Sequence, residues 1–224
     1  KTTTDISEIP VFASMWNMDG LILMGFCEAD YEKLRSQMRI SFVVYDGYFE
    51  KCSKVVNLVI DHYDGGHQAG KYFKELGHKK ALCISDNYIC MDKERIDGFC
   101  EAFAPGETLI WQIPNTEKER SHFYQEQLSE FLNRNITAIF AVSDYYALDF
   151  MRFLQGKGIR FPQDMQIIGF DDNMASREST PALTTIHQDA TLRAKTAIEC
   201  IEAMRDGRNC DAEIVLPVEL IKRE

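Results

Sequence analysis

Two kinds of segment alternate along the chain. Short runs rich in β-branched and aromatic residues are separated by longer runs whose apolar residues recur every three to four positions. The short runs predict strands at 19–25, 41–45, 55–60, 80–85, 109–113, 138–143 and 166–170, with weaker ones at 183–187 and 214–221. The longer runs predict helices at about 8–17, 30–38, 62–76, 92–103, 117–133, 144–157 and 189–205. Apolar strands that alternate with helices are typical of an α/β fold with a mostly parallel sheet covered on both faces.

The predicted helix at 144–157 carries more apolar surface than one core contact needs. We expect Asp144 to cap its free N–H groups and Gly156 and Gly158 to end it. Its apolar residues form two stripes, the first Ala147, Leu148, Met151 and Leu154, the second Tyr146, Phe150 and Phe153. Either the helix is deeply buried, which we favour, or the second stripe meets another subunit.

Composition narrows the class of protein. A chain of 224 residues with 45% hydrophobic and 27% charged residues is typical of a soluble globular protein, with one large unit or two lobes. The formal net charge of -10 argues against a large nucleic-acid interface, because phosphate binding depends on Lys and Arg. No apolar stretch approaches the roughly 20 residues of a membrane span, and residues 1–5 do not read as a secretory signal. We expect a cytoplasmic protein.

The cysteines and histidines indicate neither a disulfide framework nor a metal site. The seven cysteines are scattered without a C-x-x-C pair, as expected of reduced intracellular thiols. His62 and His67 are five positions apart, which does not place them on one helical face. We therefore expect no metal and no cofactor.

Six motifs, in order along the chain, carry a resemblance to a known family. They are DHYDGGHQAGKYFKELGHKK (61–80), ERIDGF (94–99), SDYYAL (143–148), FPQDMQIIGFDD (161–172), PALTTIHQ (181–188) and LPVELIKR (216–223). In this order and spacing the chain resembles the lactose-repressor/galactose-repressor (LacI/GalR) family of transcription regulators. The IIGFDD and PALTTIHQ segments are the most specific.

This resemblance implies a two-lobed, periplasmic-binding-protein-like type I fold with three crossings between the lobes. The crossings are expected near 76–79, near 188 and between about 207 and 216. One lobe would hold residues 1–77 and 189–211, and the other would hold 78–188 and 212–224. A ligand would bind between the lobes, at the carboxyl ends of the strands.

The sequence departs from the family pattern at its start. The family's core opens with a strand, a helix and a second strand before the helix that precedes DGLIL (19–23), and none of the three is found before Glu8. The helix-turn-helix that precedes the core in the family is also absent. We expect the chain to be part of a longer regulator, and DNA binding is expected only through that absent segment.

Arg95 and Asp171 are the leading candidates for ligand contact. Arg95 in ERIDGF matches the family's ligand-binding arginine, and a guanidinium can pair with adjacent hydroxyls, a carboxylate or a base edge. Its alternative is a surface ion pair with Glu94 or Asp92. Asp171 directly follows a strand and can accept hydrogen bonds from sugar hydroxyls or a base N–H, whereas Asp172 is better explained as a helix or turn cap.

Four further residues complete the predicted ligand site. Ser143 corresponds to a family position that often contacts ligand, and is as readily a small residue at a strand end. Asp64 opens a helix, and the matching family residue can reach the ligand from the other lobe. Gln188 lies at the second expected crossing. Trp111 either stacks on a sugar ring or belongs to the core, and the sequence does not decide between them.

The resemblance implies a dimeric sensor that binds a small sugar or nucleobase and changes the DNA affinity of its regulator. The alternative is a solute-binding receptor of a transport system, which would carry an export signal and rarely keep seven free cysteines. Catalysis is not expected, because the sequence holds no activated nucleophile, metal cluster or phosphate loop.

Overall fold

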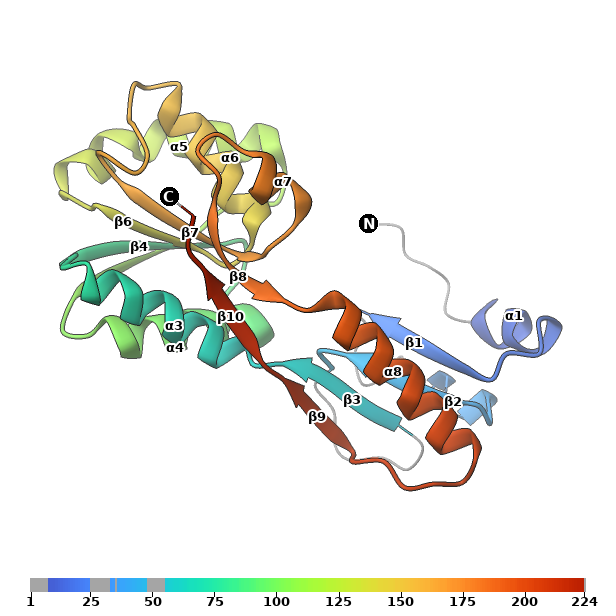
Figure 1. Cartoon of the computed structure of the whole chain (residues 1–224). Coiled ribbons are helices and arrows are strands. Elements are labelled where there is room, and N and C mark those ends of the chain that lie inside the picture. The colour runs from blue at the N-terminus through green and yellow to red at the C-terminus, as the bar shows by residue number, and fades with distance from the viewer. Residues whose placement is uncertain (1–7, 25–32, 35, 48–54, 224) are drawn as a thin grey trace. The chain divides into compact units, whose positions relative to one another are not determined.

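The computed structural model describes residues 8–24, 33–34, 36–47 and 55–223 (Figure 1). The chain divides into two compact units: unit 1 comprises Lys1–Ile60 and Asp189–Pro217, and unit 2 comprises Asp61–Gln188 and Val218–Glu224. The chain therefore passes from one unit to the other after Ile60, Gln188 and Pro217.

Unit 1 is built on a parallel sheet whose strands run in the order β1-β2-β3-β9. These strands are β1 (Gly20–Met24), β2 (Ser41–Tyr45), β3 (Val55–Ile60) and β9 (Glu213–Leu216). Helix α8 (Ala190–Arg205) packs on β1, β2 and β3, and α1 (Ile9–Met15) precedes β1. The helix predicted at 30–38 lies partly outside the described residues. Within it, residues 33–34 and 36–37 are described and are helical.

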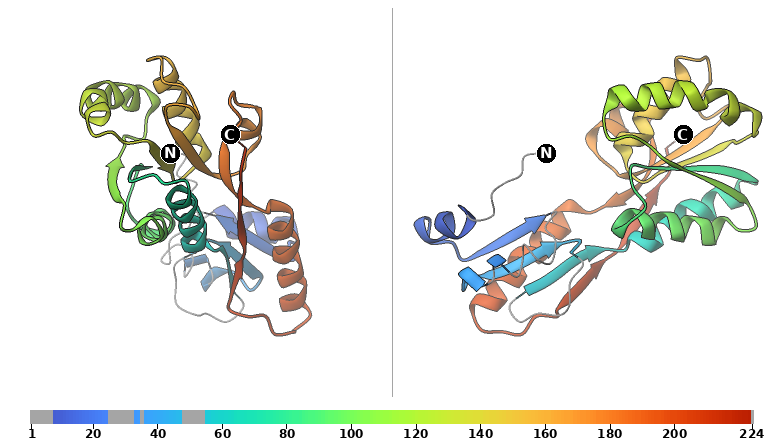
Figure 2. Two further views of the ribbon diagram at one scale, coloured as in Figure 1. Left: turned by 60° about the vertical axis from the view of Figure 1, so that its left-hand side comes forward. Right: turned by 180° about the vertical axis from the view of Figure 1, so that it is seen from behind.

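Unit 2 contains a sheet with the order β10-β8-β7-β6-β4-β5, in which only the β10–β8 pair is antiparallel. Its strands are β4 (Lys80–Ser85), β5 (Glu107–Gln112), β6 (Ala138–Ala141), β7 (Gln166–Asp171), β8 (Thr184–Gln188) and β10 (Val218–Ile221). Its helices are α3 (His62–Glu75), α4 (Cys90–Phe103), α5 (Glu117–Asn133), α6 (Asp144–Gln155) and α7 (Met174–Glu178). Helices α3 and α4 cover one face of this sheet, and α5 and α6 cover the other (Figures 1 and 2). The predicted α/β fold with mostly parallel strands is confirmed.

An aromatic cluster fills the core between this sheet and helices α5 and α6. The Trp111 ring lies 5.5 Å from that of Phe131 and 5.7 Å from that of Phe150, measured between centroids. Phe150 is fully buried, and Tyr146 and Phe153 pack against the same core. The buried interpretation of the second apolar stripe is confirmed for Phe150.

The boundary predicted at residue 77 is wrong, because α3 belongs to unit 2. Helix α3 packs along α4, and the side chain of Gln68 is hydrogen-bonded to both Val218 O (3.0 Å) and Leu220 N (2.9 Å) of β10. Likewise, the single strand predicted at 214–221 is two strands in two sheets. Pro217, which has no N–H to donate to a sheet, separates β9 from β10.

The N-terminus of α6 also differs from the prediction. Ser143 is the N-cap, and its hydroxyl accepts a hydrogen bond from Tyr146 N at 3.4 Å. Asp144 is fully buried and points away from the helix N–H groups, toward Thr185 and the backbone N–H of Asn173. The sequence assigned the cap one residue too late.

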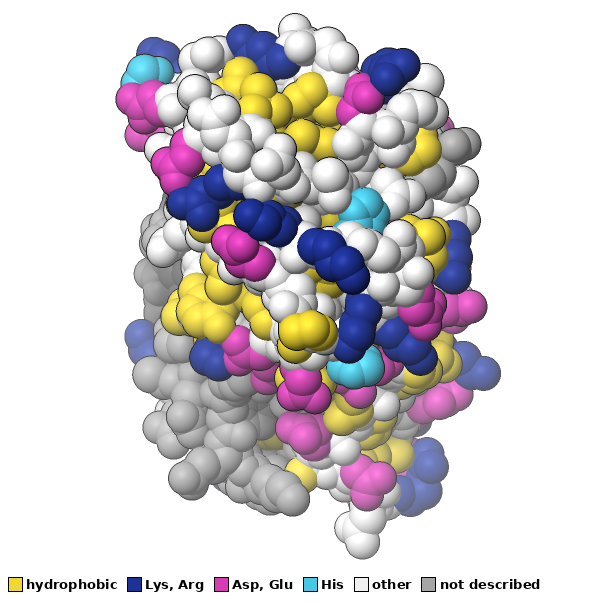
Figure 3. Space-filling model, turned by 90° about the vertical axis from the view of Figure 1, so that its left-hand side faces the viewer, with side chains coloured by type: hydrophobic (Ala, Val, Ile, Leu, Met, Phe, Trp, Pro, Cys, Tyr) yellow, Lys and Arg dark blue, Asp and Glu magenta, His cyan; other side chains and the backbone are white. Residues whose placement is uncertain are grey.

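The surface of the described residues carries mixed charges. Figure 3 shows basic and acidic side chains interspersed over one face of the molecule. No helix within residues 8–24, 33–34, 36–47 and 55–223 is long and apolar enough to cross a membrane.

Candidate functional site

The direction of winding in the sheet of unit 2 reverses between β4 and β6. From β4 the chain runs through α4 to β5 on one side, and then through α5 back past β4 to β6 on the other. The connections that leave the carboxyl ends of β4 and β6 therefore turn to opposite faces of the sheet. In open parallel sheets, ligands bind at this topological switch point.

Arg95 reaches this switch point from α4. Its side chain is buried, with a relative exposure of 8%. Its Nε donates to His62 Nδ1 at 3.2 Å, and its Nη1 donates to the carbonyl oxygen of Val142, the residue after β6. The Phe170 ring lies against the guanidinium, with its centroid 3.7 Å from Cζ. Because Arg95 is buried, it does not lie on the helix surface as the alternative of a surface ion pair requires, although its charge acts on Asp92.

His62 contacts Arg95 at the candidate site, and the sequence considered it only as a metal ligand and set it aside. It is 3% exposed and begins α3 directly after the N-cap Asp61. Because Nδ1 accepts from Arg95, the imidazole proton lies on Nε2. A polar residue just past the carboxyl end of a strand was the available signal, since that is where parallel sheets bind ligands.

Asp171 ends β7 beside Arg95 and Gln188. Its Oδ1 accepts a hydrogen bond from Gln188 Nε2 at 2.8 Å. Burial raises the pKa of Asp171 from 3.8 to about 6, although the positive charge of Arg95 opposes the shift. The backbone at Asp171 has a φ of 116°, a strained conformation for a residue other than glycine. Such strain is frequently found at functional sites.

A second set of polar residues follows β4. The Ser85 hydroxyl and the Asn87 amide each donate to Asp92 Oδ2 at 2.9 Å. Burial raises the pKa of Asp92, and burial together with Asp86 raises the pKa of Tyr146 to about 12. The positive charge of Arg95 acts on Asp92 as well as on Asp171. The sequence missed this set, although SDN (85–87) directly follows a predicted strand.

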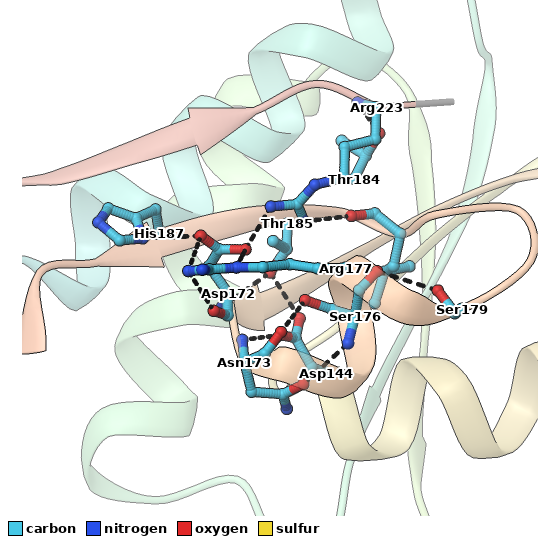
Figure 4. Close-up of polar contacts among 11 residues, drawn as sticks. Asp144, Asp172, Asn173, Ser176, Arg177, Ser179, Thr184, Thr185, His187 and Arg223 are labelled. Carbon is cyan, nitrogen blue, oxygen red and sulfur yellow. Dashed lines mark hydrogen bonds and ion pairs between the residues drawn. The ribbon is translucent and has the colours of Figure 1, made fainter.

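Asp172 is a structural ion-pair centre and not the predicted cap. His187 Nδ1 lies 2.9 Å from Asp172 Oδ2, and Arg177 Nη2 donates to the same oxygen at 2.8 Å. Arg223 also donates to this carboxylate (Figure 4). Burial alone would raise the pKa of Asp172, but the hydrogen bonds and positive charges of these donors outweigh it. The pKa of Asp172 therefore lies below its usual value. The cap of α7 is Asn173, which accepts from Ser176 N.

Three predicted site residues come together: Gln188 donates a hydrogen bond to Asp171, and the positive charge of Arg95 acts on the Asp171 carboxyl. Ser143 lies next to Val142, which accepts from Arg95, at the same edge of the sheet. Asp64 lies in the first turn of α3, where Oδ2 accepts from Gln68 Nε2 at 2.7 Å. It belongs to unit 2, so the expectation that it reaches the ligand from the other lobe is wrong.

Trp111 does not lie at this site. Its ring is buried among Phe123, Phe131 and Phe150 in the core, on the side of the sheet covered by α5 and α6. The predicted sugar-stacking role is therefore wrong, and the core alternative is correct. Among the described residues, no group of three or more His, Cys, Asp or Glu side chains is arranged to hold a metal ion.

Residues 71–224 match the family model of the periplasmic binding protein-like domain. The chain is 28% identical over 215 residues to the HTH-type transcriptional repressor PurR of Vibrio cholerae, covering 92% of this chain and 63% of the relative. It is 33% identical over 174 residues to the HTH-type transcriptional regulator DegA of Bacillus subtilis, covering 74% of this chain and 50% of that protein. The chain thus spans about 63% or less of these two relatives.

Solved structures of the same class superpose on the whole chain. A LacI family transcriptional regulator from Enterococcus faecalis V583 with bound ribose gives a TM-score of 0.80 at 25% identity, covering 100% of this chain and 83% of that one. A dimeric Lac repressor with an 11-residue C-terminal deletion gives a TM-score of 0.82 at 20% identity, covering 99% and 84%. The second likeness concerns the fold alone.

Proposed function

Since the chain belongs to the periplasmic binding protein-like family and corresponds to the effector-binding core of LacI/GalR-type regulators, we propose that it is a small-molecule sensor. Its ligand is a sugar or a nucleobase, bound at the carboxyl ends of β4, β6, β7 and β8. The alternative, a solute-binding receptor of a transport system, is less well supported, because both relatives above are named as HTH-type regulators.

The observation that carries the proposal is the placement of Arg95. A buried guanidinium is costly unless its donors are paired, and Arg95 is held by His62, Val142 O and the face of Phe170. A side chain fixed in this way loses little entropy on binding a ligand. Its planar fork of donors suits adjacent hydroxyls or the edge of a base.

Asp171 supplies the complementary acceptor. Its carboxylate accepts from Gln188 through Oδ1 and lies within the field of Arg95. A carboxylate beside a guanidinium recognises a ligand that both donates and accepts hydrogen bonds, as sugars and purines do. Ser143 adds a hydroxyl at the same edge. A regulator from Enterococcus faecalis that is 25% identical to this chain was solved with ribose, which favours a pentose among the candidates.

The chain acts on DNA indirectly in this proposal. Operator binding is assigned to a helix-turn-helix outside the 224 residues, and the ligand shifts the equilibrium between conformations that bind DNA with different affinity. We propose a homodimer in the cytoplasm, in keeping with the dimeric Lac repressor that shares the fold.

We infer binding without turnover. The adjacent acids Asp171 and Asp172 have different partners, Gln188 for the first and the cluster of Arg177, His187 and Arg223 for the second. They do not flank one bond, as a pair of glycosidase carboxylates must. A bound sugar is therefore expected to be recovered unchanged after prolonged incubation.

The proposal is tested by thermal shift against a panel of pentoses, hexoses and purines. At least one compound is expected to raise the melting temperature of the wild type. The Arg95→Lys variant keeps the positive charge but loses the planar fork of donors. Its apparent affinity for that compound should be at least about tenfold lower than that of the wild type. Arg160→Lys is the matched control, because Arg160 is exposed and its guanidinium pairs with Asp164, away from the proposed ligand site. An equal ligand response in all three proteins would refute the role of Arg95.

A further inference from the structure

Two aspartates lie on either side of Arg95 along the edge of the sheet of unit 2. Asp92 of α4 accepts from the hydroxyl of Ser85, the last residue of β4, and Asp171 is the last residue of β7. Arg95 donates to the carbonyl oxygen of Val142, just past β6, which is the strand between β4 and β7. The positive charge of Arg95 acts on both carboxyl groups.

Each of the two aspartates has one oxygen that is hydrogen-bonded within the protein and one that is not. Asp92 Oδ2 accepts from Ser85 Oγ and Asn87 Nδ2, both at 2.9 Å, and Asp171 Oδ1 accepts from Gln188 Nε2 at 2.8 Å. No residue in the described part of the chain donates a hydrogen bond to Asp92 Oδ1 or to Asp171 Oδ2. Both oxygens can therefore accept a hydrogen bond from a ligand.

The balance of charge around Arg95 favours a ligand without negative charge. Asp86 follows β4 and adds its charge to those of Asp92 and Asp171. Three other cations of unit 2 are paired with acids of their own, Arg177 and Arg223 with Asp172 and Lys93 with Asp97. A phosphate or carboxylate group beside Arg95 would also meet these three acids, and partial burial strengthens the repulsion because it lowers the effective dielectric constant.

The helix N-termini at this edge also carry acids. Helix α4 begins past β4 and has Asp92 in its first turn, and α6 begins past β6 and has Asp144 in its first turn. In many α/β proteins such a helix N-terminus binds phosphate through its free N–H groups and its dipole. A carboxylate in the first turn compensates the positive end of the dipole. These two helices therefore attract a phosphate less than helices without such acids would.

We propose that the site selects ligands without negative charge, whose hydroxyl or amino groups donate hydrogen bonds to Asp92 and Asp171. Unphosphorylated sugars, amino sugars and uncharged nucleobases meet this condition, whereas sugar phosphates, sugar acids and nucleotides are rejected. The inference rests on the function proposed above and narrows its ligand class. It makes Asp92 a residue that determines specificity, whereas the sequence considered Asp92 only as a surface partner of Arg95.

Selection by charge is tested by isothermal titration calorimetry of the wild-type chain. Glucose and galactose are each compared with their 2-amino-2-deoxy and uronic acid forms, ribose with ribose 5-phosphate, and adenine with adenosine monophosphate. A uronic acid replaces a hydroxymethyl group by a carboxylate of similar size, so this comparison reports charge rather than bulk. At least one uncharged or amino compound is expected to bind, and its negatively charged counterpart should bind at least about tenfold more weakly.

The outcomes of this titration separate the inference from the proposed function. If a negatively charged compound binds as tightly as its uncharged counterpart, or more tightly, selection by charge is wrong and the sensor function stands. If no compound of either kind binds, the proposed function fails and the inference fails with it.

The role of Asp92 is tested with Asp92→Asn, which keeps the shape of the side chain and removes its charge. This variant should discriminate less between the bound compound and its negatively charged counterpart, by at least about threefold. The matched control is Asp97→Asn, which removes a charge of the same sign from the same helix, at a side chain that pairs with Lys93. Thermal melting without ligand checks that both variants fold. The same discrimination in Asp92→Asn, Asp97→Asn and the wild type would overturn the assignment of Asp92.

Discussion

Arg95 is positioned before any ligand arrives, because His62, Val142 and Phe170 hold its guanidinium from different sides. The sequence proposed Arg95 and Asp171 as ligand contacts, since each belongs to a distinctive motif, and the structure brings them to the same edge of the sheet. It did not point to His62, because a contact between residues 33 positions apart depends on how α3 packs on α4. The stacking role predicted for Trp111 was wrong because an aromatic residue on a strand looks the same in sequence whether it faces the core or a ligand.

The pKa of Asp171 predicts how stability depends on pH. Its folded pKa of about 6 lies above the 3.8 of an unperturbed aspartate, so the folded state holds this proton more tightly than the unfolded state. The contribution of Asp171 to the free energy of unfolding therefore decreases as pH rises from about 4 through about 6. At pH 7.5, Asp171→Asn should be more stable than the ligand-free wild type by about 1–3 kcal/mol.

Urea denaturation from pH 4 to pH 8 measures this difference. The gap between Asp171→Asn and the wild type should shrink as pH falls below about 6, where the wild-type carboxyl takes up its proton. A gap that does not vary with pH would rule out titration of Asp171 in this range.

Arg120 makes a separate prediction about stability. It is fully buried, and its Nε donates to Asp149 Oδ2 at 2.7 Å while Nη2 donates to the hydroxyl of Tyr145 at 2.8 Å. Arg120→Met leaves Asp149 without its charge partner, so the free energy of unfolding should fall by about 3–5 kcal/mol. Arg134→Met removes the exposed pair with Glu130 on the same helix and should cost under about 1 kcal/mol. Similar losses in urea denaturation for both variants would contradict this account.

At the scale of elements, the contact between α3 and α4 fixes the site. A Cβ on Gly66 would come within 1.8 Å of a backbone oxygen, which cannot move aside as a side chain can. Gly66→Ala should therefore separate the two helices, lower the free energy of unfolding by about 1–3 kcal/mol and weaken ligand binding. The control is Gly156→Ala at the end of α6, where the nearest atom is 3.3 Å away and φ is -61°. If the two variants melt at the same temperature, the close approach of α3 and α4 does not contribute to stability.

The strand-helix alternation was readable because buried parallel strands are apolar throughout, whereas helices repeat every 3.6 residues. Two errors came from single residues. Pro217 divides one apolar run into β9 and β10, in different sheets, and Ser143 takes the cap assigned to Asp144. In each case the type of element was predicted correctly, and contacts formed in the folded chain decided where the strand or the helix begins and ends.

At the scale of the whole molecule, the chain divides after Ile60, Gln188 and Pro217. The family resemblance placed the first crossing near residues 76–79, so the whole segment before residue 78 was assigned to one lobe. What decides is the packing of α3 on α4 and the bonds from Gln68 to β10, which join residues about 150 positions apart. All the residues proposed to bind ligand lie in unit 2. Substitutions at these residues should therefore abolish ligand binding without disturbing the sheet of unit 1.

The central claim is that a sugar or nucleobase binds at the carboxyl ends of β4, β6, β7 and β8, between Arg95 and Asp171. The most direct measurement is a crystal structure of the chain with the compound that raises its melting temperature most. We expect ligand atoms within hydrogen-bond distance of the Arg95 guanidinium and the Asp171 carboxylate. A ligand bound elsewhere, such as in the surface pocket lined by Pro114, Thr116 and Phe123, would contradict it.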